Sequence, residues 1–336
     1  MRSPDNGSHR SGPYLAGIIS ALPHLASILP YGLTNDNILG IIESDTREIR
    51  GNAHRNEVSV PTIAILNQKG GVAKTTTAVT LGAGLALRGH RTLLIDLDSQ
   101  GNVSDALGIR KGPGLYQLLV GKKPWRELVI PSGLVESRRL LDLLPGDKTT
   151  VEAKIYLTTQ PFREHALRRA FDLLDQVYEF VILDLAPSVD VLHVGALVAS
   201  DAFLVVTRLD HLAVVGVNDA LLTLVALKDQ GAGFPELLGI LPTFWDRTTK
   251  ESEHQLSALA KTFGNRLWPP IPLDVKAREA PAYGQTLWEY APRCRALMGA
   301  EIGERHIGGY GQALERLLDH VAASDRYQSK HRMVSP

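Results

Sequence analysis

The segment Asn-Gln-Lys-Gly-Gly-Val-Ala-Lys-Thr-Thr-Thr at residues 67–77 constrains the fold of this chain more than any other. It follows the apolar, β-branched run Thr62–Asn67 and precedes Thr75–Arg88, whose pattern predicts a helix. The paired glycines Gly70 and Gly71 let the backbone turn tightly with no Cβ in the way. Backbone N–H groups in such a loop, with the positive end of the following helix, attract an anion. The segment therefore predicts a phosphate-binding loop between a buried strand and a helix.

Short apolar runs recur after this loop and alternate with stretches that predict helices. Runs that are apolar throughout are typical of strands buried on both faces, and this alternation favours a parallel sheet. The predicted strands are Thr92–Asp96, Leu140–Leu144, Phe180–Asp184, Ala202–Thr207 and Leu237–Pro242. The predicted helices are His165–Val177, Val217–Lys228, Leu256–Phe263 and Gly311–Ala322. The fold class is therefore α/β, with a mostly parallel sheet covered by helices on both faces. The phosphate loop makes a single P-loop NTPase domain the expectation.

The two ends of the chain differ in composition from its middle. Residues 1–59 carry four prolines and no long periodic element, which predicts an irregular N-terminal extension, partly disordered, with one short helix around Tyr14–Leu29. Residues 60–323 form the predicted P-loop domain. Residues 324–336 are polar and predict a frayed C-terminal tail.

Composition limits the classes of function. Lys plus Arg (36) equals Asp plus Glu (36), so any contact with nucleic acid needs a local basic patch. The single cysteine, Cys294, excludes a disulfide framework and a zinc site of several thiolates, and it fits a reducing cytoplasm. No run reaches the ~18 apolar residues that span a bilayer. The N-terminal apolar stretch is interrupted by prolines, so export is not expected.

The loop departs from the ordinary pattern G-x-x-x-x-G-K-[ST], because Gln68 and Ala73 stand at its two glycine positions. It matches K-G-G-x-x-K-[ST], with an additional lysine at Lys69. This form resembles the deviant Walker A loop of the ParA/MinD family, and in particular ParA/Soj-type partition ATPases. Ala73 replaces the more frequent glycine, and we expect its methyl group to have a modest effect on loop geometry.

The resemblance implies roles for each loop residue. Lys74 reaches the β- and γ-phosphates of ATP, and the Thr75 hydroxyl binds Mg²⁺. Lys69 crosses to the phosphates of a second subunit in an ATP-sandwiched homodimer, so that hydrolysis depends on dimerisation. The remaining phosphate contacts fall on Gly70, Gly71, Val72, Ala73 and Thr76.

Carboxylates follow two of the predicted strands. The stretch Asp96–Asn102 resembles the family's D-x-D-P-Q-G-N, with serine in place of proline at position 99. The resemblance gives Asp98 the task of orienting the attacking water and places Asp96 near the metal. Asp184, which ends the apolar run Phe180–Asp184, is the Walker B equivalent and would hold Mg²⁺ through water. The next two residues, Leu185 and Ala186, depart from the family's D-[TC]-P-P-S and leave the hydrolysis rate open.

Three further stretches agree with the family in order and spacing, so the resemblance spans about Val60 to Ala300. They are Leu141–Lys154, Pro242–Thr248 and Ile271–Gly284. By resemblance, Pro272 and its neighbours to Val275 lie near the adenine. Arg247, Lys276 and Arg278 fall where the family binds DNA, through phosphate contacts that are independent of sequence. Leu273 stands where the family usually has an arginine.

The resemblance predicts a Mg²⁺-dependent ATPase that is slow without a partner. ATP would drive formation of a homodimer that binds nucleoid DNA non-specifically, and a ParB-like partner would stimulate hydrolysis and release the dimer. The expected cofactors are ATP and Mg²⁺, and the expected location is the cytoplasm, on the nucleoid.

Other functions remain open on this scaffold. A MinD-like membrane cycler needs a basic amphipathic helix, whereas the candidate Ala313–Val321 holds Glu315 and Asp319, so a membrane partner is not expected. A cargo-positioning ATPase shares the partition mechanism with another adaptor. A metabolic reductase of this fold needs cluster cysteines that the chain lacks, and a ligase needs a substrate pocket that the sequence does not reveal.

Overall fold

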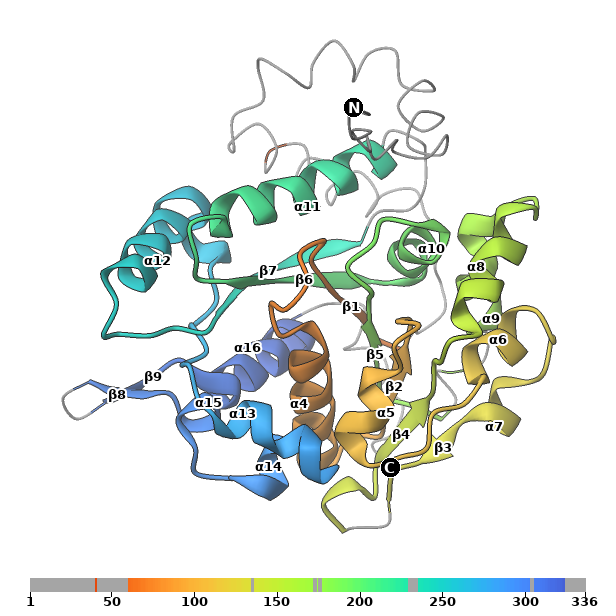
Figure 1. Cartoon of the computed structure of the whole chain (residues 1–336), viewed down its shortest axis with the longest axis horizontal. Helices are drawn as coiled ribbons and strands as arrows, with labels where there is room; N and C mark the ends of the chain where they lie inside the picture. Colours follow the sequence, from red (N-terminus) through yellow and green to blue (C-terminus); the bar gives the residue numbers. More distant parts are fainter. Residues whose placement is uncertain are drawn as a thin grey trace, which may run out of the picture.

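The computed structural model describes residues 40, 60–133, 136–171, 174, 177–228, 235–302 and 305–323. Its centre is a seven-stranded sheet of order β3-β4-β2-β5-β1-β6-β7 (Figure 1). Every neighbouring pair is parallel except β3 and β4. The strands are β1 (Thr62–Leu66), β2 (Thr92–Asp96), β3 (Ile130–Pro131), β4 (Leu141–Leu144), β5 (Phe180–Asp184), β6 (Ala202–Arg208) and β7 (Glu236–Thr243). The predicted α/β class with a mostly parallel sheet is confirmed.

Helices cover both faces of the sheet, because alternate strand residues face two separate cores. Ile63 and Ile65 pack into one core, and Ala64 and Leu66 into the other. The first core is covered by α4 (Lys74–Leu87), α5 (Asn102–Leu107), α13 (Lys276–Glu279), α14 (Leu287–Tyr290), α15 (Arg295–Met298) and α16 (Gly309–Ala323). The second is covered by α6 (Gly114–Leu119), α7 (Trp125–Leu128), α8 (Thr150–Thr158), α9 (Ala166–Ala170), α10 (Val191–Ala199), α11 (Ala213–Lys228) and α12 (Lys250–Phe263).

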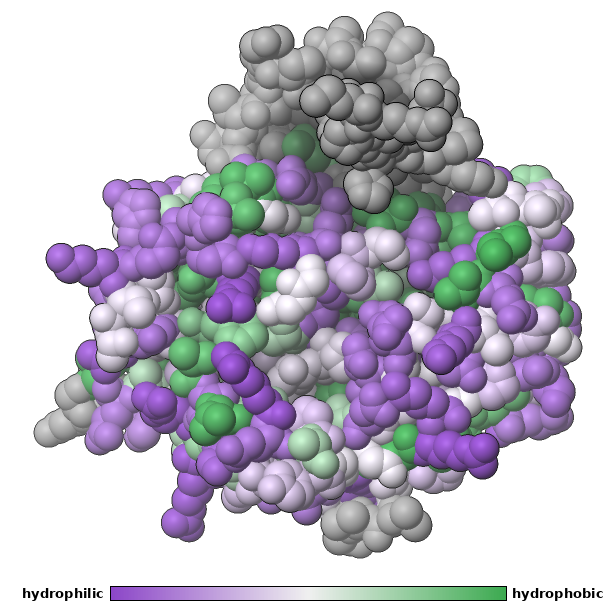
Figure 2. Space-filling model, viewed as in Figure 1, coloured by the Kyte–Doolittle hydropathy of each residue, from purple (hydrophilic) through white to green (hydrophobic). Residues whose placement is uncertain are grey.

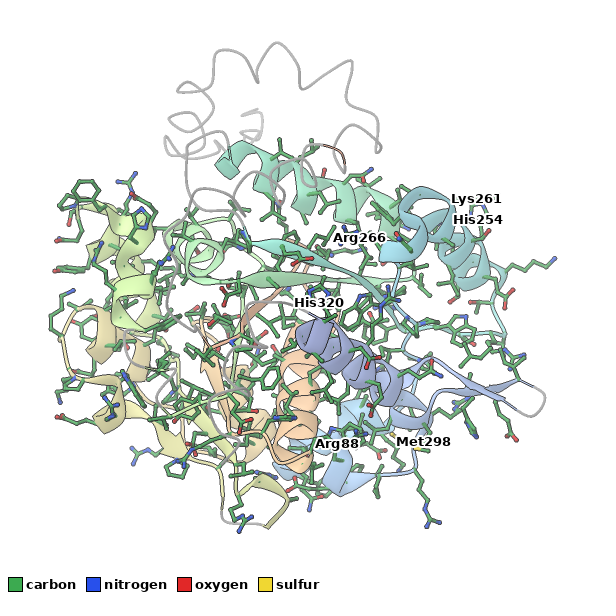
Figure 3. All side chains as sticks on the ribbon, turned by 180° about the vertical axis from the view of Figure 1, so that it is seen from behind. Arg88, His254, Lys261, Arg266, Met298 and His320 are labelled. Atoms are coloured by element: carbon green, nitrogen blue, oxygen red, sulfur yellow. The ribbon has the colours of Figure 1, made fainter. Side chains whose placement is uncertain are left out.

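Helix α16 packs directly on the helix that follows the predicted phosphate loop. The hydroxyls of Thr77 and Tyr310 share a buried hydrogen bond of 3.0 Å. Arg88, at the end of α4, forms an ion pair with Glu315 of α16, and the two helices lie side by side in Figure 3. The last described helix is therefore part of the core.

An antiparallel hairpin, β8 (Ala300–Ile302) and β9 (Arg305–Ile307), forms a second small sheet.

Some elements differ from those predicted. Helix α10 was not predicted, since its nine residues are apolar almost throughout and show no period; Asp190 caps it by accepting the N–H groups of Leu192 and His193. Helix α12 begins at Lys250, six residues before the prediction, behind the cap Thr249. Helix α9 ends at Ala170, and part of the longer helix predicted there lies outside the described residues.

The extension before residue 60, with its predicted helix, and the tail after residue 323 also lie outside the described residues, residue 40 excepted. Among the described helices, none is both long and apolar enough to cross a bilayer.

Candidate nucleotide site

The predicted phosphate loop lies between β1 and α4, at the carboxyl edge of the sheet. Gly70 and Gly71 are exposed, and a Cβ added at either would meet no atom within 4 Å, so open space faces the loop. Gly71 has φ of 70° and Ala73 has φ of 71°, both in the left-handed region. A residue with a Cβ is strained there by roughly 1–2 kcal/mol. Ala73 therefore adopts this turn at a cost in backbone strain that the sequence did not reveal.

Lys74 begins α4 and is buried beneath the loop. Its Nζ donates a hydrogen bond of 2.9 Å to the carbonyl oxygen of Lys69. Burial lowers the pKa of Lys74, while the charges of Asp184 and Asp98 raise it. No described carboxylate lies within ion-pair distance of this ammonium. A buried cation behind an open, glycine-rich loop is suited to an anionic ligand such as phosphate.

Lys69 forms an ion pair within its own chain. Its Nζ lies 2.8 and 2.6 Å from the two carboxylate oxygens of Asp210, which follows β6. Burial raises the pKa of Asp210, but the hydrogen bonds from Lys69 and from the Leu212 N–H outweigh it and lower the pKa. Asn67 fixes the loop beside β6, because its Nδ2 donates to the Val206 carbonyl and its Oδ1 accepts the Lys69 N–H. The Asp210 partner was not predicted from the sequence.

Asp184 and Thr75 form the part of the site that suits a metal ion. Oδ2 of Asp184 accepts a hydrogen bond of 2.7 Å from the Thr75 hydroxyl. Oδ1 is buried and accepts no hydrogen bond from any described residue. Burial raises the pKa of Asp184 to about 7, against the lowering effects of Thr75 and Lys74. An orphaned carboxylate oxygen beside a hydroxyl fits a divalent cation that also takes phosphate and water oxygens.

The described residues contain no group of three or more His, Cys, Asp or Glu side chains that could hold a metal by themselves. Mg²⁺ at this site would therefore need oxygens from a bound nucleotide in addition to the protein. That requirement agrees with a site in which metal and phosphates bind together.

Asp96 is fully buried opposite Asp184, its register neighbour on β5. Its Oδ1 accepts the N–H of Asp98 at 3.0 Å, and its Oδ2 accepts the N–H of Val103 in α5 at 3.1 Å. Burial, and then the Asp184 charge, raise its pKa well above the usual range. Both oxygens are thus engaged in holding the loop that carries Asp98. Asp98 is half-buried, and its Oδ1 accepts the N–H of Gln100 at 3.0 Å.

The predicted adenine and DNA residues partly converge on one cavity. This cavity of about 820 Å³ is lined by Pro272, Arg247 and Arg278, together with Arg295, which sequence reasoning missed. Arg247 donates a hydrogen bond of 2.9 Å to the Glu301 carbonyl. Lys276 does not line the cavity, and its Nζ lies 2.8 Å from Glu279.

Main-chain and side-chain contacts connect this cavity to the phosphate loop. The Thr243 hydroxyl, at the end of β7, donates to the Val72 carbonyl of the loop. The next turn pairs with the 271–273 segment, because Trp245 donates to Ile271 and Leu273 donates to Trp245. These contacts connect the segment that carries Pro272 to the phosphate loop through the end of β7.

Known proteins are similar to this chain in sequence and in fold. A family model described as an AAA domain matches residues 60–233. Over 231 residues the chain is 39% identical to the chromosome-partitioning ATPase Soj of Thermus thermophilus, covering 68% of this chain and 88% of that protein. It is 35% identical over 244 residues to the sporulation initiation inhibitor protein Soj of Bacillus subtilis, covering 71% and 94%. This chain belongs to the ParA/Soj family of partition ATPases.

A solved structure of moderate similarity shares the fold of this chain. Cobyrinic acid a,c-diamide synthase of Mycobacterium smegmatis, solved with an ATP analogue and magnesium, is 33% identical, with a TM-score of 0.58 over 67% of this chain and 92% of that one. The loop Lys69–Thr75 lies inside the range that the family model matches. The predicted membership of the ParA/Soj family is therefore confirmed.

Proposed function

We propose that this chain is a partition ATPase that binds ATP and Mg²⁺ at the carboxyl edge of its sheet and hydrolyses ATP to ADP and phosphate. The observation that carries the proposal is the Thr75–Asp184 hydrogen bond, with the second Asp184 oxygen buried and free of described partners. Lys74 lies directly beside it, at the base of the open loop. Together they offer a cation, a metal-binding oxygen pair and backbone N–H groups to one triphosphate.

The chain's own residues have separable tasks in this proposal. Lys74 and the loop N–H groups bind the phosphates. Bound Mg²⁺, held by Thr75 and by Asp184 through water, would neutralise charge on the β- and γ-phosphate oxygens. Asp98 orients the attacking water. Asp96 acts as a positioning residue, because both of its oxygens hold the Asp98 loop and the start of α5.

Dimerisation completes the proposed site. Lys69 leaves Asp210 and contacts the phosphates held by a second copy. Its present ion pair is about one-third exposed (33% for Lys69 and 27% for Asp210), and such pairs contribute only about 0–1 kcal/mol, so the exchange costs little. Exposed apolar side chains stand on segments that follow β4, β5 and β6 at the same edge, which suits contact with another copy. They are Val151, Ile155, Val189, Leu212 and Val215.

DNA binding and a ParB-like stimulator belong to the same proposal. Arg247 and Arg278 would contact DNA phosphates from the cavity rim, and Lys276 would do so after exchanging its contact with Glu279. The predicted place of action is the nucleoid. A cargo-positioning role would use the same cycle with another adaptor. A MinD-like use of α16 is disfavoured, since Ala313, Leu314 and Leu317 are buried in the core.

The test is the ATPase rate of the full chain with and without Mg²⁺, then with plasmid DNA, then with a ParB-like protein encoded beside the gene. We expect slow, Mg²⁺-dependent turnover that the partner increases. Asp184→Asn should remove the Mg²⁺ dependence along with the turnover. Turnover that is equally fast in excess chelator would refute the proposed metal role.

A further inference from the structure

A second cavity lies away from the nucleotide site, between the α6–α7 connection and α9. It has a volume of about 340 Å³, near the lower end of the roughly 300–1,000 Å³ that is usual for ligand sites. Its floor is apolar and includes Leu118 and Ala166, and the buried ring of Trp125 forms one wall. Lys122, Lys123 and Arg169 stand on its rim. We call these six residues the basic pocket.

The rim cations have no acidic partner among the described residues. In the described part of the chain, none of the three rim cations lies within ion-pair distance of a carboxylate, and no acidic residue lines the cavity. Lys122 donates a hydrogen bond to the Leu119 carbonyl, and Arg169 donates one to the Phe162 carbonyl. These contacts orient the two side chains but do not neutralise their positive charges. Beside the pocket, Arg126 stacks over Trp125 at 4.4 Å from the ring centroid.

The backbone beside the basic pocket is also unusual. Lys122 has φ of 55° and Phe162 has φ of 52°, so two of the four described non-glycine residues with positive φ lie at this surface. A third, Ala73, lies in the phosphate loop. Strained residues of this kind concentrate at functional sites. Phe162, whose carbonyl oxygen accepts from Arg169, is moreover 72% exposed.

We propose that the basic pocket binds an acidic protein segment that carries an apolar anchor side chain. The anchor would occupy the apolar floor, and flanking carboxylates would pair with Lys122, Lys123 and Arg169. A nucleic-acid backbone has phosphates for the rim but no apolar group for the floor. The pocket is also small for a cofactor, whereas it suits a single large side chain.

The location makes this surface independent of the proposed nucleotide and DNA contacts. Helices α6, α7 and α9 lie together at the β3–β4 end of the sheet, whereas α13 and the larger cavity lie toward the other end (Figure 1). Hydrophilic residues dominate the surface over α6 and α7, next to a green apolar patch over α8 (Figure 2). An acidic partner could therefore bind while the nucleotide site is occupied.

The test is fluorescence anisotropy with the full chain and three labelled probes. The first is a pool of short peptides with Asp or Glu flanking Leu, Phe or Trp. The second is the same pool with Ser in place of the apolar residues, and the third is a short DNA duplex. We expect the first pool to bind at least about tenfold more tightly than the second.

Charge reversal then assigns the site. The double variant Lys123→Glu with Arg169→Glu should weaken binding of the apolar acidic pool by about tenfold or more, while nucleotide binding stays unchanged. The matched control, Lys250→Glu with Lys261→Glu on exposed positions of α12, should bind as the wild type does. Equal binding of the two peptide pools, or no binding of either, would overturn the proposal. So would a double variant that loses DNA binding but still binds the apolar acidic pool as the wild type does.

Discussion

The strained alanine of the phosphate loop gives a quantitative prediction. Ala73 has φ of 71° and ψ of 32°, which costs a residue with a Cβ roughly 1–2 kcal/mol. Glycine removes that strain but loses about 0.5–1 kcal/mol more backbone entropy on folding. The difference between these two costs is about 0–1.5 kcal/mol, so Ala73→Gly should raise the free energy of unfolding by about 0.75 kcal/mol. For a domain of this size that corresponds to an increase in Tm of roughly 2–3 °C.

A second alanine-to-glycine change gives the matched control. Ala258 lies inside α12 with ordinary helical geometry, where glycine costs about 0.5–1 kcal/mol. Calorimetric melting of the nucleotide-free chain should thus show opposite shifts, upward for Ala73→Gly and downward for Ala258→Gly. A lower Tm for both variants would refute the assignment of strain to Ala73.

Three further predictions concern the carboxylates. Asp210→Asn should release Lys69 and so lower the protein concentration at which light scattering detects ATP-dependent dimers. The free energy of unfolding should change by no more than about 1 kcal/mol. Weaker dimerisation would mean that Asp210 assists the lysine. Asp98→Ala should lower turnover by about 100-fold while ATP dimers accumulate, with Ser99→Ala as the active control; unchanged turnover would exclude Asp98 as the group that orients water. The folded-state pKa of Asp184, about 7, exceeds its unfolded value of about 3.9, so the native state binds the extra proton. That stabilisation is complete below pH ~4 and is lost as the pH rises through about 7. In metal-free denaturant titrations between pH ~4 and about 7, the free energy of unfolding of the wild type should fall relative to that of Asp184→Asn. If the two proteins changed in parallel with pH, the raised pKa of Asp184 would be contradicted.

The parallel strands and the phosphate loop could be predicted from the sequence, because both depend on local patterns, whereas the short strands β3, β8 and β9 were not predicted. Uniformly apolar runs identified the buried parallel strands, and the Gly70-Gly71 pair with its lysines identified the loop. The same patterns gave the positions of Asp96 and Asp184 at strand ends. Their adjacency follows from β2 and β5 being neighbours in the sheet, which the folded structure shows.

The remaining features depend on contacts between distant segments. Asp210 lies 141 residues after Lys69, and it reaches the lysine because β6 neighbours β1 in the sheet. Arg295 reaches the Pro272 cavity from α15. Nor could the left-handed backbone of Ala73 be predicted from its identity, because alanine favours the opposite sign of φ. Such features require the folded chain.

Calorimetric titration with a non-hydrolysable ATP analogue and Mg²⁺ tests the central proposal most directly. The wild type should bind the analogue, and omission of Mg²⁺ should weaken the binding. Lys74→Ala should show no measurable binding, whereas Lys261→Ala, an exposed lysine on α12, should bind as the wild type does. If Lys74→Ala, folded by circular dichroism, bound the analogue within about twofold of the wild type, the triphosphate could not rest on this loop.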